Sequence, residues 1–102
     1  MIELTKNYAI KADRNCFTIC IKGTEKGETV WNAKWYFTSL DHVFLKIISL
    51  SVAEGIKKGS WEAVSKELTK AKNMIEEKMD IILNTAKKND IPLEGKKLAG
   101  LV

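Results

Sequence analysis

The chain has 102 residues, of which 45% are hydrophobic and 29% charged, and it carries one histidine, two cysteines and a single proline. These values are typical of one small globular domain and exclude a disordered or collagen-like chain. The net charge of +4 is spread thinly, because residues 1–51 hold seven basic and five acidic residues and residues 52–102 hold ten and eight. A DNA-binding protein usually concentrates its basic residues on one face or arm, so this distribution does not favour that class.

The segment at the N-terminus, MIELTKNYAIKADR, carries charges throughout, and no apolar run in the chain reaches the roughly 20 residues that a membrane span needs. We therefore expect a cytoplasmic protein with no membrane partner. Cys16 and Cys20 lie four residues apart on a predicted strand, a separation of about 13 Å. A disulfide needs Cα atoms about 4.4–6.8 Å apart, so reduced thiols are expected.

Alternating apolar residues predict the first two strands. Residues 2–12 alternate loosely, and Lys6-Asn7 in the middle predicts a bend or bulge. Residues 16–22 alternate strictly, with Phe17, Ile19 and Ile21 on one face. A polar loop over residues 23–28, with glycine near each end, then leads to the next strand.

The third predicted strand, residues 30–37, contains four of the eight aromatic residues of the chain. Strict alternation places four apolar side chains on one of its faces, namely Trp31, Ala33, Trp35 and Phe37. Two interpretations stay open. This row points toward the helices and belongs to the core, or the helices cover the opposite face and the tryptophans form an exposed binding row.

The second half of the chain predicts two helices. Ser39 is a suitable N-cap for a helix over residues 39–58, whose apolar stripe Ile48 and Val52 broaden, and Gly59 is a suitable stop. Ser60 opens a longer helix over residues 60–88, with apolar residues at spacings of three and four for about seven turns. Residues 89–102 form a tail that packs through Leu98 and Leu101 or frays.

The predicted architecture is a single α+β domain over residues 1–102. A three-stranded antiparallel meander (residues 1–37) precedes two helices that cover one face of the sheet, in the order βββαα. The distal part of the second helix, around Met74, Ile75, Met79 and Ile82, extends beyond what three strands cover. A homodimer through this helix is one way to bury it.

No set of residues predicts catalysis or cofactor binding. Gly23 and Gly27 enclose three residues rather than the four of a P-loop, and they precede a strand. His42 has no flanking signature of a nucleophile pair, and the two cysteines lack the spacing of a zinc site. We expect no enzyme activity, no metal and no cofactor. The candidates for binding a partner are the aromatic residues of the third strand and nearby or exposed lysines, namely Trp31, Lys34, Trp35, Tyr36, Lys57 and Lys58.

The first half of the chain resembles small proteins of tailed phages and prophages. The matching residues are Ile2, Leu4, Tyr8 and Ile10, then Gly27-Glu28 followed by Trp31, then Ser39, Leu40, Asp41 and Ile47 after an aromatic strand end. This family is largely of unknown function and implies no catalytic residues. What the resemblance implies is a phage accessory gene that acts in the host cytoplasm, in a neighbourhood that includes anti-CRISPR proteins.

The resemblance and the lack of a catalytic set together predict a non-enzymatic binding protein. It would inhibit or modulate a host defence complex, such as a CRISPR effector, by steric occupation of a nucleic-acid or subunit site. The alternative is a small nucleic-acid-binding protein that uses Lys34, Lys57, Lys58 and the aromatic residues. A purely structural homodimer is a third class.

Overall fold

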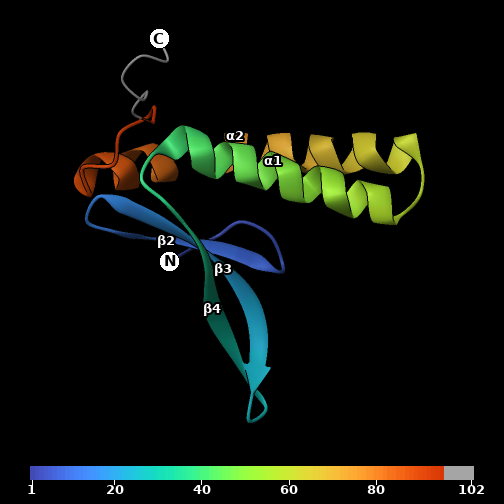
Figure 1. Cartoon of the computed structure of the whole chain (residues 1–102), viewed down its shortest axis with the longest axis horizontal. Helices are drawn as coiled ribbons and strands as arrows, with labels where there is room; N and C mark the ends of the chain where they lie inside the picture. The colour runs from blue at the N-terminus through green and yellow to red at the C-terminus, as the bar shows by residue number, and fades with distance from the viewer. Residues whose placement is uncertain (96–102) are drawn as a thin grey trace, which may run out of the picture.

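A computed structural model of the chain describes residues 1–95 and consists of an antiparallel sheet with two helices on one side of it (Figure 1). The strands pair in chain order, each antiparallel to the next. The elements are β1 (Ile2–Glu3), β2 (Tyr8–Asp13), β3 (Cys16–Glu25), β4 (Glu28–Phe37), α1 (Leu40–Lys57) and α2 (Trp61–Lys88). The α+β class, the antiparallel sheet and the two helices are confirmed, but the sheet has four strands rather than three.

The fourth strand arises at the predicted bend. The backbone reverses direction between Leu4 and Tyr8, and the amides of Leu4 and Thr5 both donate to the carbonyl of Tyr8, at 2.9 and 3.1 Å. The Thr5 hydroxyl in turn accepts from the amides of Asn7 and Tyr8. Ile2 therefore lies opposite Ile10, and the bend is the turn of a hairpin.

The loop between β3 and β4 is shorter than predicted. The strands continue to Glu25 and Glu28, which lie opposite each other, so that only Lys26 and Gly27 form the turn. Both residues have positive φ, 51° and 81°, as a type I′ turn requires. The tip of this hairpin projects away from the helices (Figure 1).

An irregularity in β4 divides its apolar residues between the two faces of the sheet. Ile19 lies opposite Trp35, but the next residue of β3, Cys20, lies opposite Ala33, so Lys34 is an extra residue. This β-bulge shifts the alternation by one position. Trp35 and Phe37 lie on the face toward the helices, whereas Trp31 and Ala33 lie on the other. The predicted single row of four apolar residues is therefore wrong.

The core lies between the sheet and the helices. Phe17, Ile19 and Ile10 of the sheet are fully buried there, against Leu40 and Val43 of α1 and, from α2 and the segment after it, Ala71, Met74, Ile82, Ala86 and Ile91. Met74 and Ile82, which were expected to need a second copy of the chain, are buried within this core. The expected reason for a dimer through α2 therefore does not hold.

The segment that follows α2 packs at the start of α1. The amides of Leu40 and Asp41 donate to the carbonyls of Pro92 and Leu93, both at 2.9 Å, and the Asp41 carboxylate accepts from the amide of Gly95 at 3.1 Å. Ser39 is the N-cap as predicted, but its hydroxyl donates to Asp41 instead of capping a backbone amide. Leu98 and Leu101 lie outside the described residues.

Candidate partner-binding surfaces

The sheet has one face that neither helix covers (Figure 1), and we call it the open face. Residues directly opposite each other in antiparallel strands share a face, so the strand register defines its rows. One row is Lys11, Thr18 and Tyr36, the next is Ala9, Cys20 and Ala33, and the third is Lys22 and Trp31. The open face thus has small side chains in its middle row and an aromatic residue on each side of them.

The two aromatic residues of the open face are not equally accessible. Tyr36 is 68% exposed and Trp31 is half-buried, while Ala9 and Cys20 between them are fully buried. Because α1 and α2 lie on the other side of the sheet, neighbouring side chains of the open face itself must shield these small residues. The accessible part of this face is therefore formed by Tyr36, Trp31, Ala33 and the exposed lysines Lys11 and Lys22.

A buried hydroxyl lies beside the exposed tyrosine. Thr18 is fully buried, and among the described residues its Oγ1 has no hydrogen-bond partner. An unsatisfied buried polar group of this kind costs about 1–3 kcal/mol. It is next to Tyr36 in the register, so a displacement of the Tyr36 side chain would open a route to it.

The charges of the open face balance. The strand register places Lys11 and Lys22 on it, and Glu3 and Asp13 at its margin, since Glu3 lies opposite Ala9 and Asp13 opposite Cys16. All four side chains are exposed. A balanced surface with central aromatic residues is more typical of a protein interface than of a phosphate-binding surface.

The sequence-predicted binding residues do not form one site. Trp31 and Tyr36 lie on the open face, and Lys34 lies at the bulge of the edge strand, exposed to solvent. Trp35 packs against the core on the helix side, where the Lys46 ammonium lies 4.2 Å from the centre of its ring. The remaining two, Lys57 and Lys58, lie on another element, at the turn between α1 and α2.

Sequence reasoning missed a second apolar stripe on α1. The inner stripe contains the buried residues Leu40, Val43 and Ile47. On the opposite side are Leu45, Ile48, Ser49, Val52, Ala53 and Ile56, which we call the outer stripe and which recur at spacings of three and four. Leu45 is 61% exposed, Ile48 42% and Ile56 65%. A helix that is apolar on all sides is normally buried, so the outer stripe is an unusual solvent-facing surface.

Trp61 is a large exposed side chain at the end of the helix pair where α1 and α2 are joined. It is the first residue of α2, after the turn that follows Lys57, and it is 89% exposed. Tryptophan is rarely so exposed in a protein without a partner. The sequence signal that could have predicted the outer stripe is the width of the apolar surface of α1, since Ile48 and Val52 already lie outside a single helix face.

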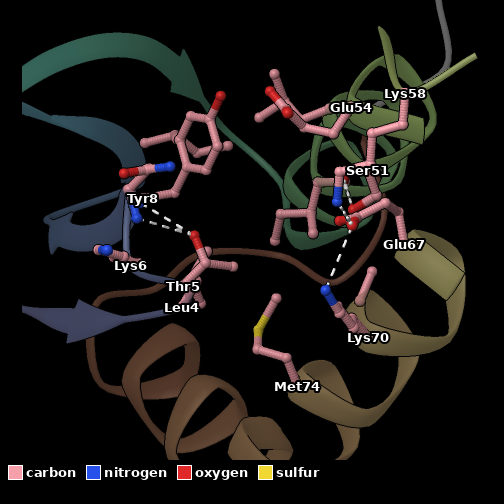
Figure 2. A pocket seen from close by; sticks show the side chains of 15 residues that line it. Leu4, Thr5, Lys6, Tyr8, Ser51, Glu54, Lys58, Glu67, Lys70 and Met74 are labelled. Carbon is pink, nitrogen blue, oxygen red and sulfur yellow. Dashed lines mark hydrogen bonds and ion pairs between the residues drawn. The ribbon is translucent and has the colours of Figure 1, made fainter. Parts of the chain in front are cut away.

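A cleft of about 320 Å³ separates the β1–β2 turn from the helices (Figure 2). Leu4 and Tyr8 line one side, and Ser51 and Glu54 of α1 with Lys70 and Met74 of α2 line the other. Its floor is apolar. On the helix side of its rim, the Glu67 carboxylate binds Lys58 at 2.6 Å and Lys70 at 3.4 Å.

Three charged groups of the cleft, Glu67, Lys58 and Lys70, engage one another. The hydrogen bond from Lys58 lowers the pKa of Glu67 below its usual value, and the same bond raises the pKa of Lys58. The Glu67 side chain is only 15% exposed, so this ion pair connects the end of α1 to α2 in a partly shielded place. We regard it as a structural contact between the helices.

Within residues 1–95, no three His, Cys, Asp or Glu side chains lie close enough to hold a metal ion. Cys16 is half-buried and Cys20 is buried, and they are not joined to each other. His42 is exposed, and its Nδ1 lies 3.0 Å from the Ser39 hydroxyl.

In residues 1–95, neither helix has an apolar stretch long enough to cross a membrane. No protein-family model, no curated protein and no solved structure matches this chain.

Proposed function

We propose that this chain is a binding protein without a reaction of its own, and that it docks a protein partner in the host cell through the open face of its sheet. The resemblance of its first half to phage accessory proteins favours one version of this function. In that version the chain inhibits a bacterial defence complex, such as a CRISPR effector, by steric occupation.

The observation that carries the proposal is the position of Tyr36 and Trp31. Both lie on the sheet face that the helices leave uncovered, on either side of the exposed Ala33. Accessible tyrosine and tryptophan side chains are typical centres of protein interfaces, where they contribute much of the binding energy. Within residues 1–95 the buried Thr18 hydroxyl has no hydrogen-bond partner, so a bound protein that displaces the Tyr36 side chain could satisfy it.

The test is an affinity pull-down of the tagged protein from bacterial lysate, with and without nuclease, for the wild type and for Tyr36→Ala and Trp31→Ala. Leu93→Ala, which removes a 60% exposed apolar side chain elsewhere, is the control. We expect a stoichiometric protein that survives nuclease, binds the control and is lost from both open-face variants. A protein that binds all variants equally would contradict the proposal.

The defence-inhibitor version has its own test. A purified CRISPR effector is assayed for target cleavage with increasing amounts of the wild-type chain or of Tyr36→Ala. Inhibition by the wild type and loss of inhibition in Tyr36→Ala would support it. Undiminished cleavage by a panel of effectors, together with a different captured protein, would exclude this version while leaving the open face as a binding surface.

A nucleic-acid function is the second candidate, because single-stranded bases can stack on exposed aromatic side chains of a four-stranded sheet. In this candidate Lys34 and the aromatic residues of β4 bind the nucleic acid together with Lys57 and Lys58. The two latter residues lie on a different element, at the end of α1. Its signature is an affinity for single-stranded oligonucleotides that falls steeply as salt is raised, because bound phosphates release counterions. Partners that all disappear on nuclease treatment would favour this candidate over the first.

A further inference from the structure

We infer that a second copy of this chain covers the outer stripe of α1, so that two chains associate through antiparallel α1 helices. This inference goes beyond the proposed function and rests on a different surface. The open face and the outer stripe lie on opposite sides of the molecule, because the sheet and its core separate them (Figure 1).

The first argument is the composition of α1. Only four of its eighteen residues are charged, namely Asp41, Lys46, Glu54 and Lys57, and none of them belongs to the outer stripe. The helix α2 also has exposed apolar residues, namely Trp61, Ile81 and Leu83, but they are few in 28 residues. Exposed polar and charged residues such as Glu62, Asn73 and Asp80 lie between them along the chain. The series of apolar residues at spacings of three and four on the solvent side is therefore a feature of α1.

The second argument is that the outer stripe is complementary to itself. A two-fold axis between residues 50 and 51 places Ile48 against Ala53 of the partner subunit, and Val52 against Ser49 of the partner subunit. Large side chains then meet small ones at the centre, as close packing of two helices requires. Leu45 meets Ile56 of the partner subunit at each end. Self-complementarity of one patch about a two-fold axis is the property that an isologous dimer needs.

The third argument concerns the charges at the ends. An antiparallel pair brings Lys57, at the negative end of one helix dipole, toward Asp41 at the positive end of the other. Lys58 takes no part in this, because it pairs with Glu67 of its own chain. The charges of Lys57 and Asp41 and the two dipoles are then complementary.

The fourth argument is area. A stable interface buries about 800 Å² per partner, and α1 alone is too narrow to supply all of it. Trp61 follows Ile56 by five residues, across the turn between the helices, so the two-fold axis brings it toward the start of α1 of the partner subunit. A tryptophan can bury about 150–250 Å². This arrangement gives the 89% exposed Trp61 a partner and widens the interface beyond the stripe.

The test is the solution mass of the wild type, measured by light scattering over a range of concentrations, with Ala53→Glu and Ala33→Glu as matched variants. The chain mass is 11.5 kDa, and we expect twice this value for the wild type. Ala53→Glu places two like charges at the centre of the interface and should weaken association at least 100-fold. Ala33→Glu introduces the same side chain on the open face and should leave the dimer intact.

Two further variants keep the result interpretable. Ile56→Glu changes a side chain that is 65% exposed and outside the chain's own core, so it should give a folded monomer by circular dichroism. The double variant Ile48→Lys with Ala53→Glu places opposite charges against each other in the inferred register and should restore part of the association. A monomeric wild type, or dimers unaffected by Ala53→Glu and Ile56→Glu, would overturn the inference.

The same variants separate this inference from the proposed function. Ala33→Glu should remove the partner in the pull-down and keep the dimer, whereas Ala53→Glu should remove the dimer and keep an open face able to bind. If both variants lose the partner, association of two copies is required for binding. If neither variant loses the partner, the open face is not the binding surface, and this conclusion holds for a monomer and for a dimer.

Discussion

Trp31 and Trp35 lie on opposite faces of the sheet, although they are four residues apart on one strand and regular alternation would place them on the same face. The reason is Lys34, the extra residue that lies between the pairs Ile19–Trp35 and Cys20–Ala33. Trp35 consequently packs at the core beneath the helices, and Trp31 remains available on the open face. One inserted residue thus separates the structural tryptophan from the candidate functional one.

This separation predicts different effects of the same substitution. Trp35→Ala should lower the free energy of unfolding by about 2–4 kcal/mol, because it removes a large side chain at the core and its contact with Lys46. Trp31→Ala should cost about 1 kcal/mol or less, since no helix packs on its side of the sheet. Urea titrations followed by circular dichroism measure both. Equal losses, or a larger loss for Trp31→Ala, would contradict the register of β4.

The helices were predictable because their signals are local and agree with each other. Ser39 and Ser60 precede apolar residues at spacings of three and four, and Gly59 follows the first helix with a φ of 79°. The bulge was not predictable, because Trp31, Ala33, Trp35 and Phe37 fall at alternate positions and hide the shift. The separate strand β1 was not predictable either, because it is only two residues long.

The candidate surfaces were predictable only in part. Trp31 and Tyr36 were identified by residue type, but their common face depends on the bulge, which no local pattern indicates. The outer stripe of α1 was merged with the inner one, since a broad apolar helix looks the same whether a second layer covers it or not. Trp61 has the right spacing to begin the apolar series of α2, yet it lies at the first helical position and is 89% exposed, so spacing alone does not indicate its environment.

The β3–β4 turn predicts a stabilising substitution. Lys26 has a φ of 51°, a conformation that costs an ordinary residue about 1–2 kcal/mol and that asparagine tolerates better. Lys26→Asn creates the Asn-Gly pair that type I′ turns prefer, and it should raise the free energy of unfolding by about 0.5–1 kcal/mol. Gly27→Ala, at a φ of 81°, should lower it by a similar amount. Thermal melts of the two variants should therefore move in opposite directions.

Replacing Gly55 by alanine should lower the stability of the protein, although helix propensity alone predicts an increase. Alanine is normally favoured over glycine in a helix by about 1 kcal/mol. A Cβ at residue 55, however, would lie 2.8 Å from the backbone nitrogen of Val64, so α1 and α2 would have to move apart. Gly55→Ala should destabilise the protein by about 2 kcal/mol or more.

The control for Gly55 is Lys66→Gly, at an exposed position within α2. There the ordinary propensity cost of up to about 1 kcal/mol should be seen, so glycine is unfavourable at residue 66 and required at residue 55. A stabilised Gly55→Ala variant would show that the helices do not approach as closely as described.

The ion pair of Glu67 should make the stability of the protein fall at acid pH. Its pKa is lowered in the folded chain, mainly by the hydrogen bond from Lys58, so folding is favoured by its ionised form. This contribution is fully present above the pKa of glutamate in the unfolded chain, about 4.3, and is lost as the pH falls through the lowered folded value. Glu67→Gln should therefore melt at a lower temperature than the wild type at pH 7, and the difference should shrink at the most acid pH. Glu76→Gln, which removes an exposed carboxylate 4.0 Å from Lys72, should have little effect at any pH. A deficit in Glu67→Gln that stayed constant down to pH 2 would assign the loss to packing of the side chain and not to its charge.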